Sequence, residues 1–306
     1  MPKKSIVVVG SSNTDMVVNV ARIPKPGETI LGGSFHTAPG GKGANQAVAA
    51  QRAGGAVTFV ASVGQDAFGQ QAVTGFVKEG INVDHISRHK TEPSGVALIF
   101  VAADGENSIA VASGANARLT QTQVEKAAGA IARASVLVMQ LETPLPTIEY
   151  AARAAAGKKV AVILNPAPAR PLPDALLRRV TILTPNETEA EILTGIKVTD
   201  NASAAKAAGV LLAKGVCIVI ITLGSRGALV AMTGLTQHIP GFKVKPVDTT
   251  AAGDCFNGAL AVAFAEEQPL LDAVRFANAA AALSVTKQGA QPSAPKRRDI
   301  EKLLAR

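Results

Sequence analysis

The sequence contains few aromatic residues. None of its 306 residues is Trp, one is Tyr and nine are Phe, so aromatic side chains make up only 3% of the chain. Hydrophobic residues nevertheless account for 47%, and most of them are Ala and Val. This content is ample for a buried core, and its character predicts aliphatic strands packed against Ala-rich helices. The length suits one large α/β domain or two smaller ones.

Cysteine is also scarce, with only Cys217 and Cys255 present. One lies in an apolar run and the other on a predicted helix, so the sequence indicates neither a disulfide framework nor a zinc site. A reducing compartment fits this pattern, and we expect a cytoplasmic protein. The histidines lack convincing spacing for metal ligands, and we interpret all of them as surface or structural residues: His36, His85, His89 and His238.

Long apolar runs are absent too. No segment approaches the ~18 apolar residues that a transmembrane helix needs, and the run Ile6–Val9 is too short for the apolar region of a signal peptide. We therefore expect a soluble protein with no membrane partner. The formal net charge of +8 raises the question of nucleic-acid binding, but the basic residues are scattered apart from short groups such as Lys296–Arg298. We expect no nucleic-acid partner.

The pattern of apolar residues predicts a parallel sheet. The run Ile6–Val9 ends at Gly10 and indicates a buried strand with a loop at its carboxyl end, where the ligand loops of open α/β sheets lie. From Thr120 onward helical and strand patterns alternate regularly, beginning with a helix expected over 120–132. Such alternation requires a central, mostly parallel sheet with helices on both faces, so the fold class is α/β. No linker is long enough to divide residues 1–306, which we interpret as a single domain.

Several extended segments differ in pattern from the core strands. They cover 16–20, 29–36, 94–101 and 107–111, and the last two flank Asp104-Gly105, a pair that favours a hairpin turn. We expect these segments to form a small separate β-sheet, inserted into the main domain from about 13–38 and 92–112.

The stretch Asp248–Ala259 places small residues and a carboxylate where a loop turns into a helix. The first N–H groups of such a helix have no intrahelical partner, and the positive end of the helix dipole lies behind them. Ala251–Gly253 add no bulk that would keep a phosphate from this backbone, and Asp254 sits where a general base would meet a hydroxyl. Alternatively, Asp248 or Asp254 is only an N-cap, as aspartates at helix starts often are.

Two common phosphate loops are absent. The pair Gly41-Lys42 lacks the earlier Gly of a Walker A loop and is followed by Gly43 where that loop has Ser or Thr. No Gly-x-Gly-x-x-Gly motif follows the first predicted strand, which removes the usual dinucleotide signature. A nucleotide would therefore have to be held in another way.

Two segments resemble the signatures of a known family. Residues 39–47, Pro-Gly-Gly-Lys-Gly-Ala-Asn-Gln-Ala, are similar to the first signature of the ribokinase-like (PfkB-type) carbohydrate kinases, and residues 248–259 are similar to the second. Their order and separation also fit the family. Further family-like pieces extend the resemblance over nearly the whole chain, at 10–15, 26–29, 140–142, 165–169, 184–189, 222–227 and 287–293. The resemblance implies a ribokinase-like fold and an ATP-dependent sugar kinase that uses Mg²⁺ with the nucleotide.

Within the family, the sugar-site residues most resemble those of members that bind ribose. A pentose offers hydroxyls and no charge, so its pocket needs carboxylates and amides placed for paired hydrogen bonds. The resemblance implies phosphorylation of D-ribose at its 5-hydroxyl to give ribose 5-phosphate. Taken singly, Asn13 or Glu142 would be an ordinary loop residue and Asp15 could cap a turn, but their shared position beyond predicted strand ends favours one site. The implied substrate-binding residues are Asn13, Asp15, Gly41, Lys42, Gly43, Asn45, Glu142 and Asp254.

The resemblance also assigns the catalytic groups. Asp254 would be the general base for the attacking hydroxyl, and the backbone N–H groups of Ala251, Ala252 and Gly253 would stabilise the charge on the transferred phosphoryl group. Cys255 follows the base where related kinases often carry Thr. We interpret it as a small packing substitution, although a thiol beside an anion site could make activity sensitive to oxidation.

Nucleotide and metal sites are implied in the same way. Asn186–Glu189 resembles the family's Asn-x-x-Glu element, in which Glu189 would act on Mg²⁺ through its water shell. An Asn N-cap followed by acidic first-turn residues would explain the same letters. The implied nucleotide-binding residues are Asn186, Thr222, Gly224, Ser225, Gly227, Gly253 and Asn278. A site for a monovalent cation, expected to be K⁺, is implied at Asp248, Thr250, Ser284, Lys287, Gly289 and Ser293, with backbone oxygens used at some positions.

Other functions stay open at this point. A related kinase could act on another sugar or on a nucleoside, which would require aromatic surface from Phe35, Phe100 or Tyr150. A binding or regulatory protein could keep the fold without catalysis, but Asp254 after Ala-Ala-Gly argues against it. We expect the small sheet to close over the sugar as a lid that excludes water. Its exposed face and edges, together with the resemblance, predict a homodimer formed through this sheet.

Overall fold

The apolar runs of the chain form one large sheet. The computed structural model describes residues 4–306, and its nine-stranded sheet has the order β13-β12-β11-β10-β9-β8-β1-β4-β5. Strands from β11 to β5 run parallel to their neighbours, and β12 and β13 are added antiparallel at one edge. The expected mostly parallel sheet is therefore confirmed. Its strands are β1 (Ser5–Val9), β4 (Ala56–Gly64), β5 (Asn82–His89), β8 (Val136–Met139), β9 (Ala161–Leu164), β10 (Ile182–Leu183), β11 (Ile218–Thr222), β12 (Gly227–Met232) and β13 (Leu235–Pro240).

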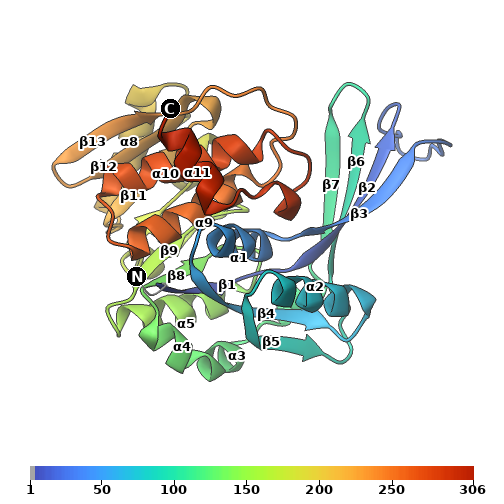
Figure 1. Ribbon diagram of the computed structural model, residues 1–306, viewed down its shortest axis with the longest axis horizontal. Coiled ribbons are helices and arrows are strands. Elements are labelled where there is room, and N and C mark those ends of the chain that lie inside the picture. The colour runs from blue at the N-terminus through green and yellow to red at the C-terminus, as the bar shows by residue number, and fades with distance from the viewer. Residues whose placement is uncertain (1–3) are drawn as a thin grey trace.

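Helices cover both faces of this sheet (Figure 1). Ile6 and Val8 of β1 belong to one hydrophobic core and Val7 and Val9 to another, because successive side chains of a strand point to opposite faces. The first core also contains residues of α1, α9 and α10, and the second contains residues of α3, α4, α5 and α8. The helices are α1 (Lys42–Arg52), α2 (Ala67–Lys78), α3 (Gln121–Lys126), α4 (Ala128–Arg133), α5 (Leu145–Ala156), α6 (Asp174–Leu177), α7 (Glu187–Thr194), α8 (Asn201–Ala213), α9 (Ala252–Ala265), α10 (Leu270–Ser284) and α11 (Arg297–Leu304).

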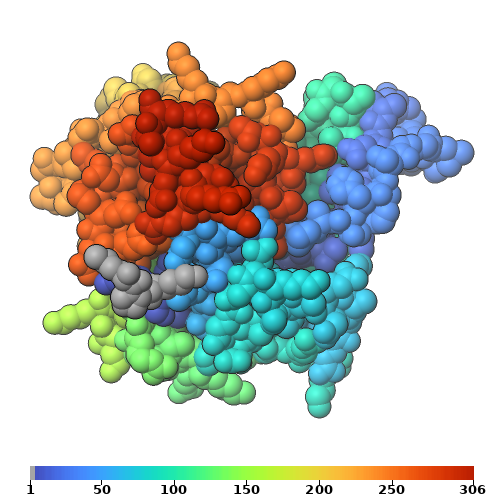
Figure 2. Space-filling model, viewed as in Figure 1, coloured from blue at the N-terminus to red at the C-terminus, as the bar shows by residue number. Residues whose placement is uncertain are grey.

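A second, four-stranded sheet stands beside the main body (Figure 1 and Figure 2). Its order is β3-β2-β6-β7, formed by β2 (Asn13–Val20), β3 (Ser34–Gly40), β6 (Gly95–Ala102) and β7 (Asn107–Ala112). The expected small sheet is thus present. Because β2 follows the loop after β1 and β3 leads directly into α1, the root of this sheet lies at the carboxyl edge of the large sheet, where the candidate site residues were expected.

Three elements differ from the sequence-based expectation. The helix predicted over 120–132 is divided into α3 and α4, because the Ala127 N–H bonds the Val124 carbonyl three residues back and breaks the α-helical pattern. The strand predicted over 29–36 is instead β3, whose pairing with β2 runs from Ser34 opposite Asn19 to Gly40 opposite Asn13. The C-terminal helix α11 was not predicted, because its sequence is highly charged and only Ile300 is buried.

The site depends on a close crossing of α1 and α9. A Cβ atom added at Gly258 of α9 would lie 2.6 Å from the Cβ of Ala49 and 2.7 Å from the carbonyl oxygen of Gln46. Only glycine allows this approach, which sets the first turn of α9 against α1.

Gly258→Ala is expected to lower the free energy of unfolding by about 1–3 kcal/mol, because the added methyl group forces the two helices apart. Gly209→Ala in α8 is the matched control, since a Cβ atom there would meet no atom within 4 Å. Because Ala has a higher helix propensity than Gly, the free energy of unfolding of Gly209→Ala should rise by up to ~1 kcal/mol. Urea unfolding followed by circular dichroism measures both changes, and a Gly258→Ala variant as stable as the control would contradict the close crossing.

Candidate active site

The carboxylate of Asp254 is held from the neighbouring helix. Its Oδ2 accepts a hydrogen bond of 2.9 Å from Asn45 Nδ2, and its Oδ1 accepts one of 2.9 Å from Gln46 Nε2. The N-cap of α9 is Ala251, so Asp254 lies inside the first turn and does not cap the helix with its side chain. Burial raises the pKa of Asp254, while Lys42 and the two amides oppose this shift. The fixed, desolvated carboxylate is suited to accept a proton from a bound hydroxyl.

A row of buried amides fixes Gln46 in turn. Gln140 Nε2 donates to Gln46 Oε1 at 2.6 Å, and Gln46 Nε2 also approaches Asn165 Oδ1 at 3.0 Å. Asn165 Nδ2 donates to the Thr184 carbonyl at 3.2 Å. Gln140, Asn165 and Thr184 follow the ends of β8, β9 and β10, so three neighbouring strands position the group that holds Asp254. Sequence reasoning placed Gln46, Gln140 and Asn165 in family-like segments but assigned them no role in the site, although an amide directly after each of two buried strands was a usable signal.

The start of α9 presents free backbone donors. Ala251 has φ 59° and ψ 17°, a left-handed conformation that is strained for an L-residue. The first helical bond runs from the Cys255 N–H to the Ala251 carbonyl. The N–H groups of Gly253 and Asp254 precede it and have no backbone acceptor within residues 4–306. A Cβ atom at Gly253 would meet nothing within 4 Å, so open space adjoins these donors and an anion can approach them.

The expected sugar-site residues are brought together around the start of α1. Glu142, after β8, accepts hydrogen bonds at Oε2 from the Ser11 hydroxyl and, at 3.0 Å, from the Lys42 N–H. Asn13 Oδ1, at the start of β2, accepts from Asn116 Nδ2 at 2.7 Å. Asn45 Oδ1 is buried and has no partner among residues 4–306, so it can accept a hydrogen bond from a ligand. Ser11 and Asn116 support these side chains and were not predicted as site residues.

The glycines at this corner have a packing function. A Cβ atom at Gly43 would lie 2.5 Å from the Ser11 backbone nitrogen, and one at Gly41 would lie 2.7 Å from that of Asn13. Gly41 also has φ 89°, which favours glycine. Both positions therefore let α1 approach the loop after β1.

The charged groups of the site influence one another. Burial raises the pKa of Asp15 to about 6, with further contributions from Glu142 and Asp254. Burial alone would lower the pKa of Lys42, but Asp254, Glu142 and Glu189 outweigh it and raise that pKa. Lys42 is thus a fixed positive charge among carboxylates. Burial also raises the pKa of Glu189, and the charges of Lys42 and Asp254 act on this carboxylate as well.

Two loops meet where nucleotide binding was expected. Asn186 forms an isolated parallel bridge with Thr222, which joins the start of α7 to the end of β11. Asn186 and Glu189 form a reciprocal capping box at the start of α7. The alternative that Asn186 is an N-cap is therefore correct, and it does not exclude a further role for Glu189. Gly224 has φ 57° and open space around it. A Cβ atom at Gly227 would instead lie 2.2 Å from the Ile239 carbonyl oxygen, so Gly227 is required for strand packing.

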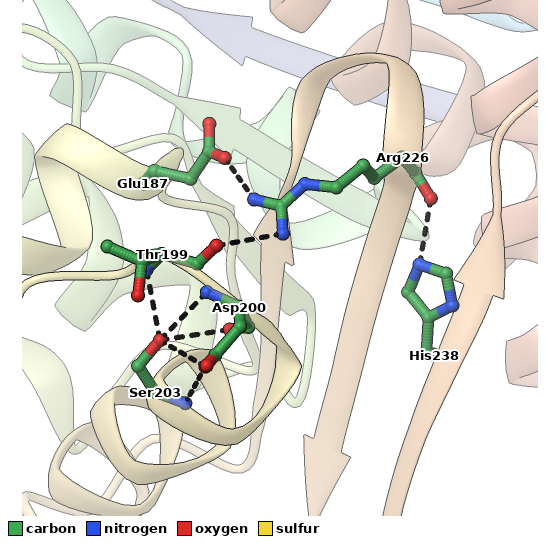
Figure 3. Close-up of polar contacts among 6 residues, drawn as sticks. All are labelled: Glu187, Thr199, Asp200, Ser203, Arg226 and His238. Carbon is green, nitrogen blue, oxygen red and sulfur yellow. Dashed lines mark hydrogen bonds and ion pairs between the residues drawn. The ribbon is translucent and has the colours of Figure 1, made fainter.

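The loop 224–227 is anchored by Arg226 (Figure 3). Its guanidinium bonds Glu187 Oε1 at 2.5 Å and the Thr199 carbonyl at 3.2 Å, while His238 Nε2 lies 2.7 Å from the Arg226 carbonyl oxygen. Ser225 on this loop is exposed. Asn278 of α10 is buried and donates weakly to the carbonyls of Ile239 and Pro240 at 3.3 and 3.4 Å, so its side chain ties α10 to the end of β13.

The residues of the expected cation site also converge. Asp248 accepts hydrogen bonds from the Thr250 N–H at 2.9 Å and the Gly289 N–H at 2.8 Å, which joins two loops distant in sequence. Burial opposes ionisation of Asp248, but these bonds hold its pKa below the usual value. The hydroxyls of Ser284 and Ser293 bond local carbonyls. Carbonyl, hydroxyl and carboxylate oxygens are the ligands that a hard cation prefers, so the chemistry of this set fits K⁺.

Cys255 is 2% exposed, and burial raises its pKa to about 12. A thiol that is buried and protonated reacts slowly with oxidants. The structure therefore favours the packing interpretation of Cys255 over oxidative sensitivity.

Comparison with known proteins identifies the family. The model of the pfkB family carbohydrate kinases matches residues 3–297. The chain belongs to this carbohydrate kinase family. A ribokinase of Haemophilus influenzae is 49% identical over 99% of both chains, and a ribokinase of Bacillus subtilis is 42% identical over 99% of this chain and 100% of its own. A solved structure of Arabidopsis thaliana ribokinase complexed with ribose and ATP covers 99% of both chains, with a TM-score of 0.93 and 35% identity.

The predicted family membership is thereby confirmed. The segments 39–47 and 248–259, which resemble the family signatures, contain the first residues of α1 and α9. No helix within residues 4–306 of this kinase combines the length and apolar character needed to cross a membrane.

The kcat/KM of this kinase is expected to rise with pH through about 6 on the hypothesis that Asp15 contacts the sugar. An ionised carboxylate offers both oxygens as acceptors to hydroxyls, and the pKa of Asp15 is raised to about 6. Asp15→Asn should lower kcat/KM and remove this titration, leaving any dependence that Asp254 contributes. Asp104→Asn, in the exposed turn between β6 and β7, is the matched control and should keep the wild-type profile. A profile unchanged in Asp15→Asn would contradict the assignment.

Proposed function

We propose that this kinase transfers the γ-phosphoryl group of ATP to the 5-hydroxyl of D-ribose and releases ribose 5-phosphate and ADP. The observation that carries this proposal is the buried carboxylate of Asp254, held by two amides beside the free N–H groups of α9. The polar cluster of Asp15, Asn45 and Glu142 adjoins it. The similarity to ribokinases over the whole chain supports ribose as the sugar.

The proposed reaction uses Asp254 as the general base. Its carboxylate would accept the proton of the 5-hydroxyl as that oxygen attacks the γ-phosphorus. The N–H groups at the start of α9 would stabilise the charge on the transferred group, and Lys42 would add positive charge on the same side. Asp15, Asn13, Asn45 and Glu142 would orient the sugar by bonds to its other hydroxyls.

Metal ions would assist at two places. Mg²⁺ would neutralise charge on the nucleotide phosphates, with the carboxylate of Glu189 reaching its water shell and Asn186 nearby. K⁺ would be held by oxygens of the loops joined through Asp248, including Thr250, Ser284, Lys287, Gly289 and Ser293. Asp248 would also keep the start of α9 in place, because its bonds to Thr250 and Gly289 fix the chain just before Ala251.

The four-stranded sheet would close over the sugar as a lid. Asp15 pairs laterally with Ala97, and Ala97 pairs with Val111, so these side chains share one face of the sheet. Ile109 and Val111 on this face are 56% and 52% exposed. Closure onto a bound sugar would bury this apolar surface and exclude water, which would otherwise compete for the phosphoryl group.

The nucleoside alternative receives little support from the aromatic residues. Phe35 and Phe100 lie on the face of the small sheet opposite Asp15, since both belong to the row that pairs with Val18. Tyr150 of α5 packs against the core on the far side of the large sheet. None of the three is placed to stack on a base attached to the sugar.

ADP release over a panel of ribose, deoxyribose, fructose, adenosine and sugar phosphates, with and without K⁺, tests the proposal. Ribose should give the highest kcat/KM, and K⁺ should raise it. If ribose gave no turnover while another substrate did, the ribose assignment would fall and the carbohydrate kinase would stand.

Asp254→Asn is expected to lower kcat by about 100- to 10,000-fold, because the amide cannot accept the hydroxyl proton. Cys255→Ala, at the next position and also buried, is the matched control and should retain most activity. Steady-state kinetics with ribose and ATP measures both. Near-full activity of Asp254→Asn would show that another group serves as base.

We further propose a homodimer formed through the small sheet, and a cytoplasmic location in which the exposed thiol of Cys217 stays reduced. The face of the sheet opposite Asp15 carries Phe35 and Leu98, which are 62% and 51% exposed. An apolar sheet face of this kind is stabilised by pairing with a second copy.

Light scattering should therefore give about twice the chain mass of 31.2 kDa. Leu98→Glu should shift the protein to monomers, because dimer formation would bury an unpaired carboxylate. Ile192→Glu on α7, where Ile192 is 52% exposed, is the control and should leave the mass unchanged. A monomeric wild type at micromolar concentration would contradict the dimer.

A further inference from the structure

A cavity of about 300 Å³ adjoins the candidate sugar site. It lies between the carboxyl ends of β8 and β9 and the root of the small sheet. Asn13, Val111 and Glu142 line it on the side of the sugar site, and Thr143 and Arg170 line it on the other. The two loops that carry these last residues are held together, since the Leu141 N–H donates to the Ala167 carbonyl at 2.9 Å.

Thr143 and Arg170 bring unused hydrogen-bonding groups to this cavity. The Nε and Nη2 atoms of Arg170 are buried and have no partner among residues 4–306, and the same is true of Thr143 Oγ1. Thr143 as a whole is only 4% exposed. A guanidinium carries only hydrogen-bond donors, and buried donors without acceptors are costly. Such groups indicate a site whose ligand completes their hydrogen bonds.

The chemistry of the cavity favours hydroxyl groups over a free anion. Arg170 forms no ion pair with Glu142 within residues 4–306, so the cavity offers both a carboxylate and a guanidinium. Glu142 uses Oε2 for Ser11 and Lys42, and its Oε1 accepts no hydrogen bond from the described part of the chain, residues 4–306. A hydroxyl can donate to Glu142 while it accepts from Arg170, whereas the negative charge of Glu142 would repel an anion.

The cavity lies at the end of the sugar site remote from Asp254. Lys42, the first residue of α1, bonds Glu142 through its backbone, and Asn45, one turn later, bonds Asp254 through its side chain. A sugar whose 5-hydroxyl reaches Asp254 would therefore extend past Glu142 toward Thr143 and Arg170. The hydroxyls at that end of a pentose are those on C1 and C2.

We infer that Arg170 and Thr143 form a specificity subsite that binds the C1 or C2 hydroxyl of the sugar. This inference rests on the proposed function, because it takes the sugar to be phosphorylated at its 5-hydroxyl. Arg170 donates a hydrogen bond to the hydroxyl oxygen, Glu142 accepts a hydrogen bond from the same hydroxyl, and Thr143 completes the polar wall. The subsite selects among sugars by rejecting those that leave the guanidinium without an acceptor.

Calorimetric titration of the full chain without ATP tests the subsite. The ligands are ribose, 2-deoxyribose and 1,4-anhydroribitol, which lacks the C1 hydroxyl. The wild type should bind ribose more tightly than at least one of the two deoxy compounds. Arg170→Met should bind ribose about tenfold to a hundredfold more weakly than the wild type does. Its affinity for the deoxy compound that the wild type binds more weakly than ribose should be unchanged. Arg170→Lys and Thr143→Val should show smaller losses with the same selectivity.

Arg133→Met, an exposed arginine at the end of α4, is the control and should bind all three ligands normally. Equal losses for ribose and both deoxy compounds in Arg170→Met would mean a structural role and would overturn the subsite. Unchanged ribose binding in Arg170→Met would also overturn it. If the wild type bound no ribose but turned over another sugar, the proposed function would fail. In that case Arg170→Met would be titrated with the other sugar, and unchanged binding would overturn the subsite as well.

Discussion

The hydrogen bonds from Asn45 and Gln46 to the Asp254 carboxylate are the contact on which the rest of the site depends. They join the first turns of two helices that lie more than two hundred residues apart, since Gln46 and Asp254 are separated by 208 positions. The bonds require α1 and α9 to cross closely, and Gly258 makes that crossing possible. They also require Gln46 to keep one orientation, which Gln140 and Asn165 enforce from the ends of β8 and β9. The large sheet thus aligns a carboxylate with the backbone donors of its own helix.

The same arrangement concentrates charge in a confined space. Burial and mutual repulsion keep the pKa values of Asp15 and Asp254 above their usual range, while Lys42 is the positive charge among them. A neutral sugar relieves part of this repulsion, because its hydroxyls can donate to the carboxylates without adding negative charge. The nucleotide would then approach from the side of the α9 N–H groups, where positive potential balances its phosphates. The sugar would thus bind among the carboxylates, and the phosphates would bind at the N–H groups of α9.

Much of the architecture could be predicted from the sequence. Buried strands such as Ile6–Val9 and Val136–Met139 are short apolar runs ended by small or polar residues, and local pattern is enough to find them. The division at Ala127 and the true extent of β3 could not be found in this way. One changed hydrogen bond, from the Ala127 N–H to the Val124 carbonyl, divides the helix, and the register against β2 sets the extent of β3. Hydrophobic periodicity shows neither feature.

The candidate site shows the same contrast. Asp254, Asn45 and Glu142 were predicted because they stand within recognisable motifs, and the structure gathers them around the start of α1. Gln46, Gln140 and Asn165 lie in the family-like segments 39–47, 140–142 and 165–169, but no role could be predicted for them. They hold other side chains, which depends on contacts between distant segments. For Gly41 and Gly43 the structure adds a packing requirement that the sequence alone could not show, since a neighbouring loop fills the space that a side chain would need.

The position of the phosphoryl group on the product tests the central claim most directly. Ribose labelled with carbon-13 at C5 would be incubated with ATP and the enzyme, and the product would be examined by carbon and phosphorus NMR. We predict carbon–phosphorus coupling at C5, because only the hydroxyl on that carbon would reach Asp254 and the start of α9 together. A product with phosphorus on another carbon, or ATP consumption with no phosphorylated ribose, would contradict the proposed geometry.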